Sequence, residues 1–316
     1  MRNTITRMVP ARLLLNCIAM SLAGALMWAS PVLGMDESPY RVGPASAALG
    51  GSGRGAVIPT ESGWLNPAAL AHISSYHFAL SHQQSNRESG EGYRDYAVLL
   101  ADGGQDRMAA GHFSYIQRSV FRPNPSGGKS ISAEQRDFQG SLAIRLPWKN
   151  ISIGGTFRRL IHEQAGADLS QNTFALGVML PITGEIGIGL TGHDLLASGE
   201  KIGTAPEEAL DARLIPRIGV GFHAIPFSIL HVRVDLVRPL EKNPGGRQNA
   251  HIGLESWFRD DFAFRVGGAW LETRDEMWLT TGLGFKGPRL SLGYSFEKEV
   301  RTANGVRHTF DLWLPL

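Results

Sequence analysis

Apolar residues recur at every second position along most of the chain. Phe262, Phe264 and Val266, for example, alternate with Ala263 and Arg265. Successive side chains on a β-strand point to opposite faces, so such a segment has one apolar face and one face of small or polar residues. The pattern predicts an all-β protein of about fourteen strands, at residues 75–83, 93–101, 107–118, 135–146, 151–162, 171–180, 184–192, 213–224, 228–238, 248–258, 262–271, 277–286, 289–297 and 306–315.

The lengths of the segments and of their connections indicate a membrane barrel. Most segments approach the ~9–11 residues that a tilted strand needs to cross a bilayer, whereas strands of soluble proteins are nearer ~5–6 residues. Short connections such as PWKN, PITG and KGP alternate with long ones such as QQSNRESGEG and HDLLASGEKIGTAPEEALDA. Bacterial outer-membrane barrels have this alternation and an even strand number. A sheet in lipid must also close, because an open edge would leave backbone groups unpaired.

We therefore expect a transmembrane antiparallel β-barrel of about fourteen strands, with both termini in the periplasm. The alternative is a periplasmic β-sandwich, which would have shorter strands and connections of less regular length. Aromatic residues near the predicted strand ends fit the girdles found at membrane interfaces. They are Tyr76, Tyr96, Trp148, Trp257, Trp270, Trp278 and Trp313.

The first 34 residues have the composition of a secretory signal peptide. Three arginines are the only charges before Asp36, and between them and residue 34 runs a mostly apolar stretch. Val32 and Gly34 are small enough for the positions that signal peptidase reads, so cleavage is expected near Gly34. The alternative is an uncleaved membrane anchor. The single cysteine, Cys17, lies inside this segment, so the mature chain has no thiol for a disulfide or a metal site.

Several stretches, in the same order along the chain, resemble known outer-membrane proteins. HIGLESWFRDDFAFRVGGAW (251–270) resembles a hairpin of PorV-like proteins, and LIPRIGVGFHAIP (214–226) and RVDLVRP (233–239), with its central aspartate, resemble two of their strands. GPASAALGGSG and SGWLNPAALA, within residues 43–71, resemble the segment that opens both PorV-like barrels and the wider long-chain fatty acid transporter (FadL) family. GIGLTGHDLL departs from the pattern, with His193-Asp194 where an asparagine-leucine pair is usual.

The resemblance implies a fourteen-stranded barrel whose N-terminal segment folds into the lumen as a plug, or hatch. After the signal peptide (1–34), we therefore expect a plug segment (35–74, with residues 40–72 in the lumen) and the barrel (75–316). The glycine-rich GGSGRG in the plug is not a phosphate loop, because no Lys-Ser or Lys-Thr follows it.

The plug residues of interest are small or turn-forming. Glycine permits close backbone approach inside a barrel, which suits Gly51 and Gly53, next to Arg54. Asn66-Pro67 is expected to form a turn in which the asparagine bonds local backbone. The alternative is an ordinary surface loop.

Titratable residues give one candidate interaction and no candidate catalytic site. If Arg259-Asp260-Asp261 is a turn, Glu255 and Arg265 lie opposite each other on the inward faces of neighbouring strands, as an ion pair in the lumen. That pair either lines a ligand path or fixes the barrel. The ten histidines show no metal-binding spacing, and His162-Glu163 and His193-Asp194 are expected to be solvated at loop starts.

No G-x-S-x-G motif occurs, so the sequence gives no sign of an enzyme and implies no cofactor. The net charge of +2 argues against a nucleic-acid partner.

Besides a purely structural or porin-like role, the resemblance leaves two functions open for a protein of the outer membrane of a Gram-negative-type bacterium. The first is a transporter or channel for small hydrophobic molecules, surrounded by outer-membrane lipid. The second is a PorV-like barrel that binds secreted or envelope proteins and moves no small molecule.

Overall fold

The computed structural model describes residues 43–87, 92–103, 108–122, 131–147, 150–164, 167–202, 214–240, 247–301 and 305–316. The description below concerns the compact unit Leu33–Leu316. The predicted signal peptide lies outside the described residues, as does Trp148 of the predicted aromatic girdle.

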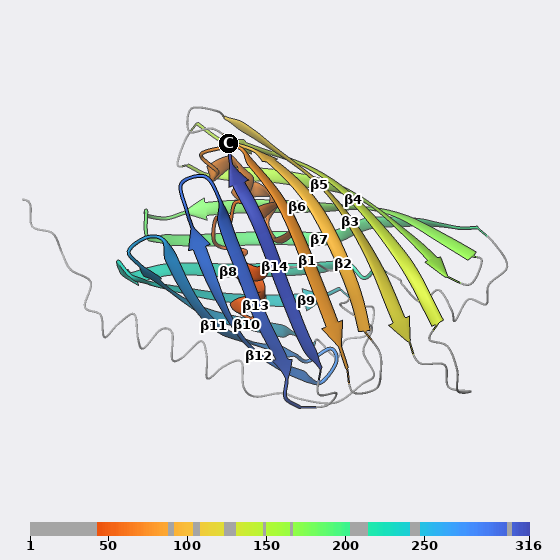
Figure 1. Cartoon of the computed structure of the whole chain (residues 1–316). Coiled ribbons are helices and arrows are strands. Elements are labelled where there is room, and N and C mark those ends of the chain that lie inside the picture. The colour runs from red at the N-terminus through yellow and green to blue at the C-terminus, as the bar shows by residue number, and fades with distance from the viewer. Residues whose placement is uncertain are drawn as a thin grey trace, which may run out of the picture. The chain divides into compact units, whose positions relative to one another are not determined.

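Fourteen antiparallel strands form a closed barrel, which confirms the predicted fold class (Figure 1). Each strand pairs with its neighbours in sequence, and β1 closes the barrel against β14, with His77 opposite Pro315. The strands are β1 (His77–Asn86), β2 (Gly92–Asp102), β3 (Ala109–Arg122), β4 (Ile131–Arg145), β5 (Ser152–Gln164), β6 (Ala167–Pro181), β7 (Ile186–Ile202), β8 (Arg217–Phe227), β9 (Leu230–Pro239), β10 (Asn249–Phe258), β11 (Phe262–Leu271), β12 (Glu276–Lys286), β13 (Ser291–Glu299) and β14 (Val306–Pro315).

The start of β1 and the end of β14 lie at the same end of the barrel as the short connections, which we call the short-turn end; the opposite end is the long-loop end.

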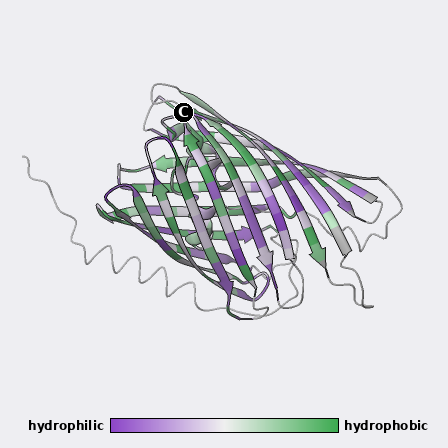
Figure 2. Cartoon of the chain, in the orientation of Figure 1, coloured by the Kyte–Doolittle hydropathy of each residue, from purple (hydrophilic) through white to green (hydrophobic). Residues whose placement is uncertain are grey.

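The period of two in the sequence separates the outward face of the barrel from the inward face. Apolar and polar residues alternate along the strands (Figure 2). Outward residues such as Leu142, Phe264 and Leu176 are large, apolar and exposed, whereas their neighbours in sequence are buried in the lumen. An apolar outer face around a polar interior is what a barrel needs to span a membrane.

The predicted aromatic girdle is only partly right. Tyr96 and Trp270 are exposed on the outward face, but Trp278 is 2% exposed and faces inward. Trp257 and Trp313 also share the inward parity of their strands. These rings follow the inward face because their position in the period of two, rather than their distance from the strand end, decides where a side chain points.

Strands β3 to β7 extend further toward the long-loop end than the sequence predicts. In β7, residues 193–202 had been assigned to a loop, and two register shifts against β6 accompany positive φ angles at Asp194 and Leu196. Such bulges let a strand continue where the alternation of side chains is interrupted. The solvated positions expected for His162, His193 and Asp194 are therefore wrong, since all three are buried on the inner wall.

The plug segment contains three short helical elements inside the barrel (Figure 1). They are the α-helices α2 (Pro44–Ala48) and α3 (Ser62–Leu65) and the 3-10 helix η1 (Pro67–His72). Much of the segment is inaccessible to solvent; Leu49 and Leu70, for example, are 0% exposed. Within the described residues, no helix is long and apolar enough to cross a membrane.

Candidate functional site: the plug, its contacts in the lumen and a groove on the outer wall

The plug follows the inner wall along a track of inward-facing glycines. Gly293 on β13 lies against Pro44, Gly282 on β12 against Ala48, and Gly253 on β10 against Leu49. The track continues on β8 and β7 beside Arg54 and Gly55, and on β6 and β5 beside residues 66–68; its members there are Gly221, Gly219, Gly189, Gly187, Gly177 and Gly154. A methyl group at Gly221 would lie 2.6 Å from the Arg54 Cβ, and one at Gly154 would lie 2.6 Å from the Ala68 nitrogen. The wall therefore accepts the plug only because these positions lack a side chain.

On β9 an aspartate takes the place of a glycine and binds the plug directly. Asp235 Oδ2 accepts hydrogen bonds from the backbone N–H groups of Gly53 (2.9 Å) and Arg54 (3.0 Å), and from Arg54 Nη1 (3.0 Å). Asp235 is 0% exposed and Arg54 is 7% exposed. Hydrogen bonds to an ionised acceptor are stronger than neutral ones, so this carboxylate is the main anchor of the GGSGRG loop.

Two further strands, β10 and β12, complete the anchoring of the loop. His251, directly opposite Asp235 on β10, bonds the Gly50 carbonyl through Nδ1 at 2.6 Å. Thr280 on β12 accepts from the Gly50 N–H (3.0 Å) and donates to the Ala48 carbonyl (2.8 Å). Gly50 and Gly51 have φ angles of 68° and 86°, which glycine adopts without strain. The predicted plug residues Gly51, Gly53 and Arg54 thus lie together at one polar contact with the wall, which we call the polar anchor (Asp235, His251 and Thr280 with residues 48–54).

Asn66 joins the loop to the helical part of the plug. Its side-chain amide donates to the carbonyls of Arg54 (2.8 Å) and, on β6, Val178 (3.2 Å). Its side-chain oxygen accepts from the Ala68 N–H at 3.1 Å and so caps η1, whose first residue is Pro67. Asn66 therefore bonds local backbone, as expected for the turn, and also reaches the wall.

Glu61 holds the two parts of the plug together and had not been singled out in the sequence. Its carboxyl accepts hydrogen bonds from the backbone N–H groups of Ala45 (2.8 Å) and Ser46 (2.9 Å), and from the Ser46 hydroxyl. Complete burial raises the pKa of Glu61 above its ordinary value of 4.5, while these donors act in the opposite direction.

The C-terminal part of the plug is held chiefly by apolar packing. Leu70, Ala71 and Ile73 form a buried cluster with small and apolar residues of β1 to β4, and Trp64 and Trp313 pack against it; the wall members are Ala79, Leu99, Ala101, Ala110 and Ala143. We call this the apolar anchor. A few hydrogen bonds supplement it, such as Ser152 Oγ to the Ala68 carbonyl at 2.7 Å. Burial lowers the pKa of His72 to about 4, so this histidine next to Ser152 is neutral at pH 7.

The structure places Glu255 and Arg265 opposite each other on β10 and β11, with Arg265 Nε 2.6 Å from Glu255 Oε2. A third residue, Arg233 on β9, also reaches the carboxylate, with Nη2 2.8 Å from Oε1. Other buried ion pairs line the wall, among them Arg118–Asp95, Arg158–Asp137 and Arg307–Glu297. The inner wall is therefore strongly polar, and the plug fills part of a lumen that water would otherwise enter.

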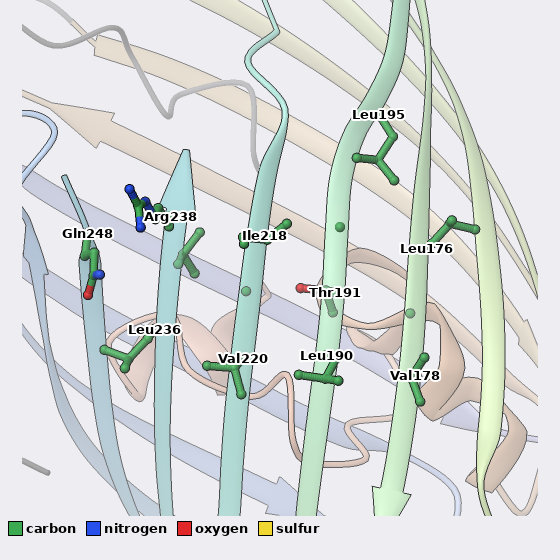
Figure 3. A pocket seen from close by; sticks show the side chains of 14 residues that line it. Leu176, Val178, Leu190, Thr191, Leu195, Ile218, Val220, Leu236, Arg238 and Gln248 are labelled. Carbon is green, nitrogen blue, oxygen red and sulfur yellow. The ribbon is translucent and has the colours of Figure 1, made fainter. Parts of the chain in front are cut away.

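A groove of about 510 Å³ lies on the outward face of β6 to β9 (Figure 3). Two register rows line it. The row nearer the short-turn end is formed by Val178, Leu190, Val220 and Leu236. The row nearer the long-loop end is formed by Leu176, Gly192, Ile218 and Arg238. Gly192 contributes no side chain to the second row; Leu195, displaced by the bulge in β7, covers this position, with its Cδ1 3.1 Å from where a Cβ of residue 192 would lie.

The sequence matches no protein-family profile and no curated protein. Solved structures match over most of the chain. A monoaromatic hydrocarbon channel, CymD, has a TM-score of 0.67 at 13% identity, covering 87% of this chain and 97% of its own. The toluene transporter TbuX of Ralstonia pickettii has 0.64 at 13% identity (87% and 98% covered). A FadL homologue of Pseudomonas aeruginosa has 0.62 at 12% identity (86% and 97% covered).

At this identity the likeness establishes the fold. The likeness confirms the barrel fold that the resemblance to the fatty acid transporter family implied. The resemblance to PorV-like proteins stays a prediction. The chain has the fourteen-stranded barrel fold of FadL-type hydrocarbon transporters.

Proposed function

We propose that this protein is an outer-membrane transporter for small hydrophobic molecules. The observation that carries the proposal is the plugged barrel: an apolar outer wall surrounds a lumen that the chain's own N-terminal segment occupies. The likeness to a hydrocarbon channel and a toluene transporter supports hydrophobic molecules as the substrate class.

In the proposed mechanism the outer loops capture the molecule, the plug moves, and the molecule leaves inward or sideways. The polar anchor suits this movement, because its hydrogen bonds can be exchanged for bonds to water. The bulged β7 offers a sideways route: within the described residues, its part beyond His193 pairs with β6 and not with β8. The outward groove lies on this same stretch of wall.

Uptake in cells tests the proposal. A strain that lacks its own hydrophobic-molecule transporters would receive the full chain, and entry of labelled toluene and labelled hexadecanoate would be compared with entry of a polar sugar. We expect faster entry of at least one hydrophobic probe and no change for the sugar. Equal entry with and without the protein, at matched outer-membrane levels, would refute transport of these molecules.

A chain without residues 40–72 tests the plug in the same assay and in planar bilayers. The barrel is expected to fold and to conduct ions and admit the sugar, because the polar lumen is then open. Unchanged conductance of the folded deletion variant would count against the plug as the barrier.

The PorV-like alternative rests on the motifs within residues 214–270 alone. Native mass spectrometry of the protein, extracted gently from outer membranes, separates the two functions. A retained small apolar molecule favours transport, whereas a stoichiometric protein partner with no small molecule favours a role in secretion or envelope assembly. The same sample gives the mature N-terminus, which tests cleavage near Gly34 and outer-membrane residence.

A further inference from the structure

We propose that the outward groove on β6 to β9 is a binding site for an anionic membrane lipid, with an acyl chain in the groove and the phosphate on Arg238. This site lies on the lipid-facing side of the wall, next to the proposed sideways exit, and is distinct from the lumen through which transported molecules are proposed to pass.

The lining of the groove fits an aliphatic chain. The rows contribute leucine, valine and isoleucine side chains, and among the described residues no aromatic ring lines the groove. These side chains are exposed on the outward face: Leu190 is 46% exposed and Ile218 is 47% exposed. The bulge in β7 interrupts the even barrel surface at this hollow, and the Leu195 side chain covers Gly192. In a membrane, the molecules that meet this hollow most often are the acyl chains of lipids.

The polar end of the groove fits an anion. Arg238 follows Leu236 on the same face of β9, one step closer to the long-loop end, and lies opposite Ile218. It is exposed and makes no ion pair with any described residue. Gln248, at the start of the neighbouring strand, also borders this end (Figure 3). A guanidinium presents a planar set of donors that matches the oxygens of a phosphate.

The direction of the groove matches a lipid in the outer leaflet. The aliphatic rows lie toward the middle of the wall, and the cation lies toward the long-loop end, where the sequence predicts the cell exterior. An arginine near the end of a membrane-spanning element interacts favourably with anionic head groups, while chains below it bury apolar surface. Both requirements are met within one continuous hollow.

Native mass spectrometry of the full chain in nanodiscs tests this proposal. The discs would contain equal amounts of dioleoyl phosphatidylglycerol, which is anionic, and dioleoyl phosphatidylcholine, which has the same chains and no net charge. We expect one phosphatidylglycerol to remain bound to the wild-type protein after release from the disc, in about tenfold preference over phosphatidylcholine.

Two substitutions test separately the binding of the lipid head group and the binding of the acyl chain. Arg238→Gln is expected to reduce the preference for phosphatidylglycerol to near one, with Lys298→Gln, another exposed outward cation, as its control. Val220→Trp fills the groove and is expected to abolish retention of both lipids, with Leu279→Trp as a control on the far wall. All four positions are exposed on the lipid-facing surface, so the barrel is expected to fold in each case.

Any one of the following lipid results would overturn the proposal: equal retention of the two lipids by the wild type, an unchanged preference in Arg238→Gln, or undiminished retention in Val220→Trp. Retention of a free fatty acid in place of phospholipid would also overturn it and would assign the groove to transported ligand. Toluene uptake by these variants is measured in parallel. Failure of lipid binding with normal uptake would leave the proposed transport intact.

Discussion

The two ends of the plug are attached to the barrel by different physical means. Residues 48–54 are attached to β9, β10 and β12 through Asp235, His251 and Thr280, all by hydrogen bonds or charge. Residues 70–73 are attached to β1 to β4 by burial of leucine and isoleucine among alanines. Hydrogen bonds to water can replace the first set, whereas release of the second would expose apolar surface at about 25 cal/mol per Å². The comparison teaches that polar contacts fix one end of the plug to the wall, whereas apolar packing holds the other end.

Breaking the polar anchor should have the largest effect. Asp235→Ala removes the acceptor of three donors and leaves the buried Arg54 without its carboxylate, a change that costs about 3–5 kcal/mol at a buried pair. We expect the GGSGRG loop to leave the wall and ion conductance in planar bilayers to rise, while the barrel stays folded. Asp261→Ala, in an exposed turn, is the control. If the Asp235→Ala variant conducts ions no better than the wild type, the polar anchor does not hold the plug.

Breaking the apolar anchor should instead lower stability. Leu70 is 0% exposed, and its replacement by alanine leaves a cavity that costs about 2–5 kcal/mol. We expect a lower melting temperature with little added conductance, because the polar anchor still holds the loop. Leu283→Ala, on the lipid-facing surface, is the control. If Leu70→Ala raises ion conductance as strongly as Asp235→Ala, both ends of the plug contribute equally to blocking the lumen, and the distinction between the two anchors is wrong.

The Glu255–Arg265 ion pair lies in the wall away from the polar anchor, so changing it should affect the stability of the barrel and not the attachment of the plug. Reversing the charge of Glu255 or of Arg265 alone should destabilise the barrel by about 3 kcal/mol, since a buried charge then faces a like charge. The double swap should restore part of that loss. Recovery is incomplete because Arg233 also bonds Glu255 and is left beside a cation. Melting temperatures of the three variants give the coupling, and strictly additive losses would contradict it.

The glycine track should show the smallest of these effects. Gly221→Ala would bring a methyl group to 2.6 Å from the Arg54 Cβ, so the plug must shift at a cost of about 1–3 kcal/mol. We expect a modest rise in conductance. Gly140→Ala is the matched control, because nothing lies within 4 Å of a methyl group there. Equal behaviour of the two variants would mean that the track does not position the plug.

The local sequence pattern predicted most of the barrel, and the errors in the predicted strand ends have a common cause. The period of two located all fourteen strands, because one face had to be apolar and the other small or polar. It ended β7 at residue 192, although the strand runs to Ile202. Beyond residue 192 bulges interrupt the alternation of side chains, so no periodic signal remains there.

The candidate site was less accessible to sequence reasoning. The Glu255–Arg265 juxtaposition followed from one hairpin turn, which fixes the register of its two strands. Asp235 carried one signal, as the central aspartate of a recognisable strand, but its partner lies 181 residues away in sequence. Glu61, His251 and Thr280 carried no signal, because their roles depend on where the plug crosses the wall.

The sequence by itself determined the alternation, the even number of strands, and hence a closed wall with an apolar exterior. These follow from the geometry of a strand, which every residue shares with its neighbours. Only the tertiary structure decided which inward glycines the plug follows, which carboxylate anchors it, and where bulges hollow the outer wall. Those features come from contacts between segments far apart in the chain, and no local pattern records such contacts.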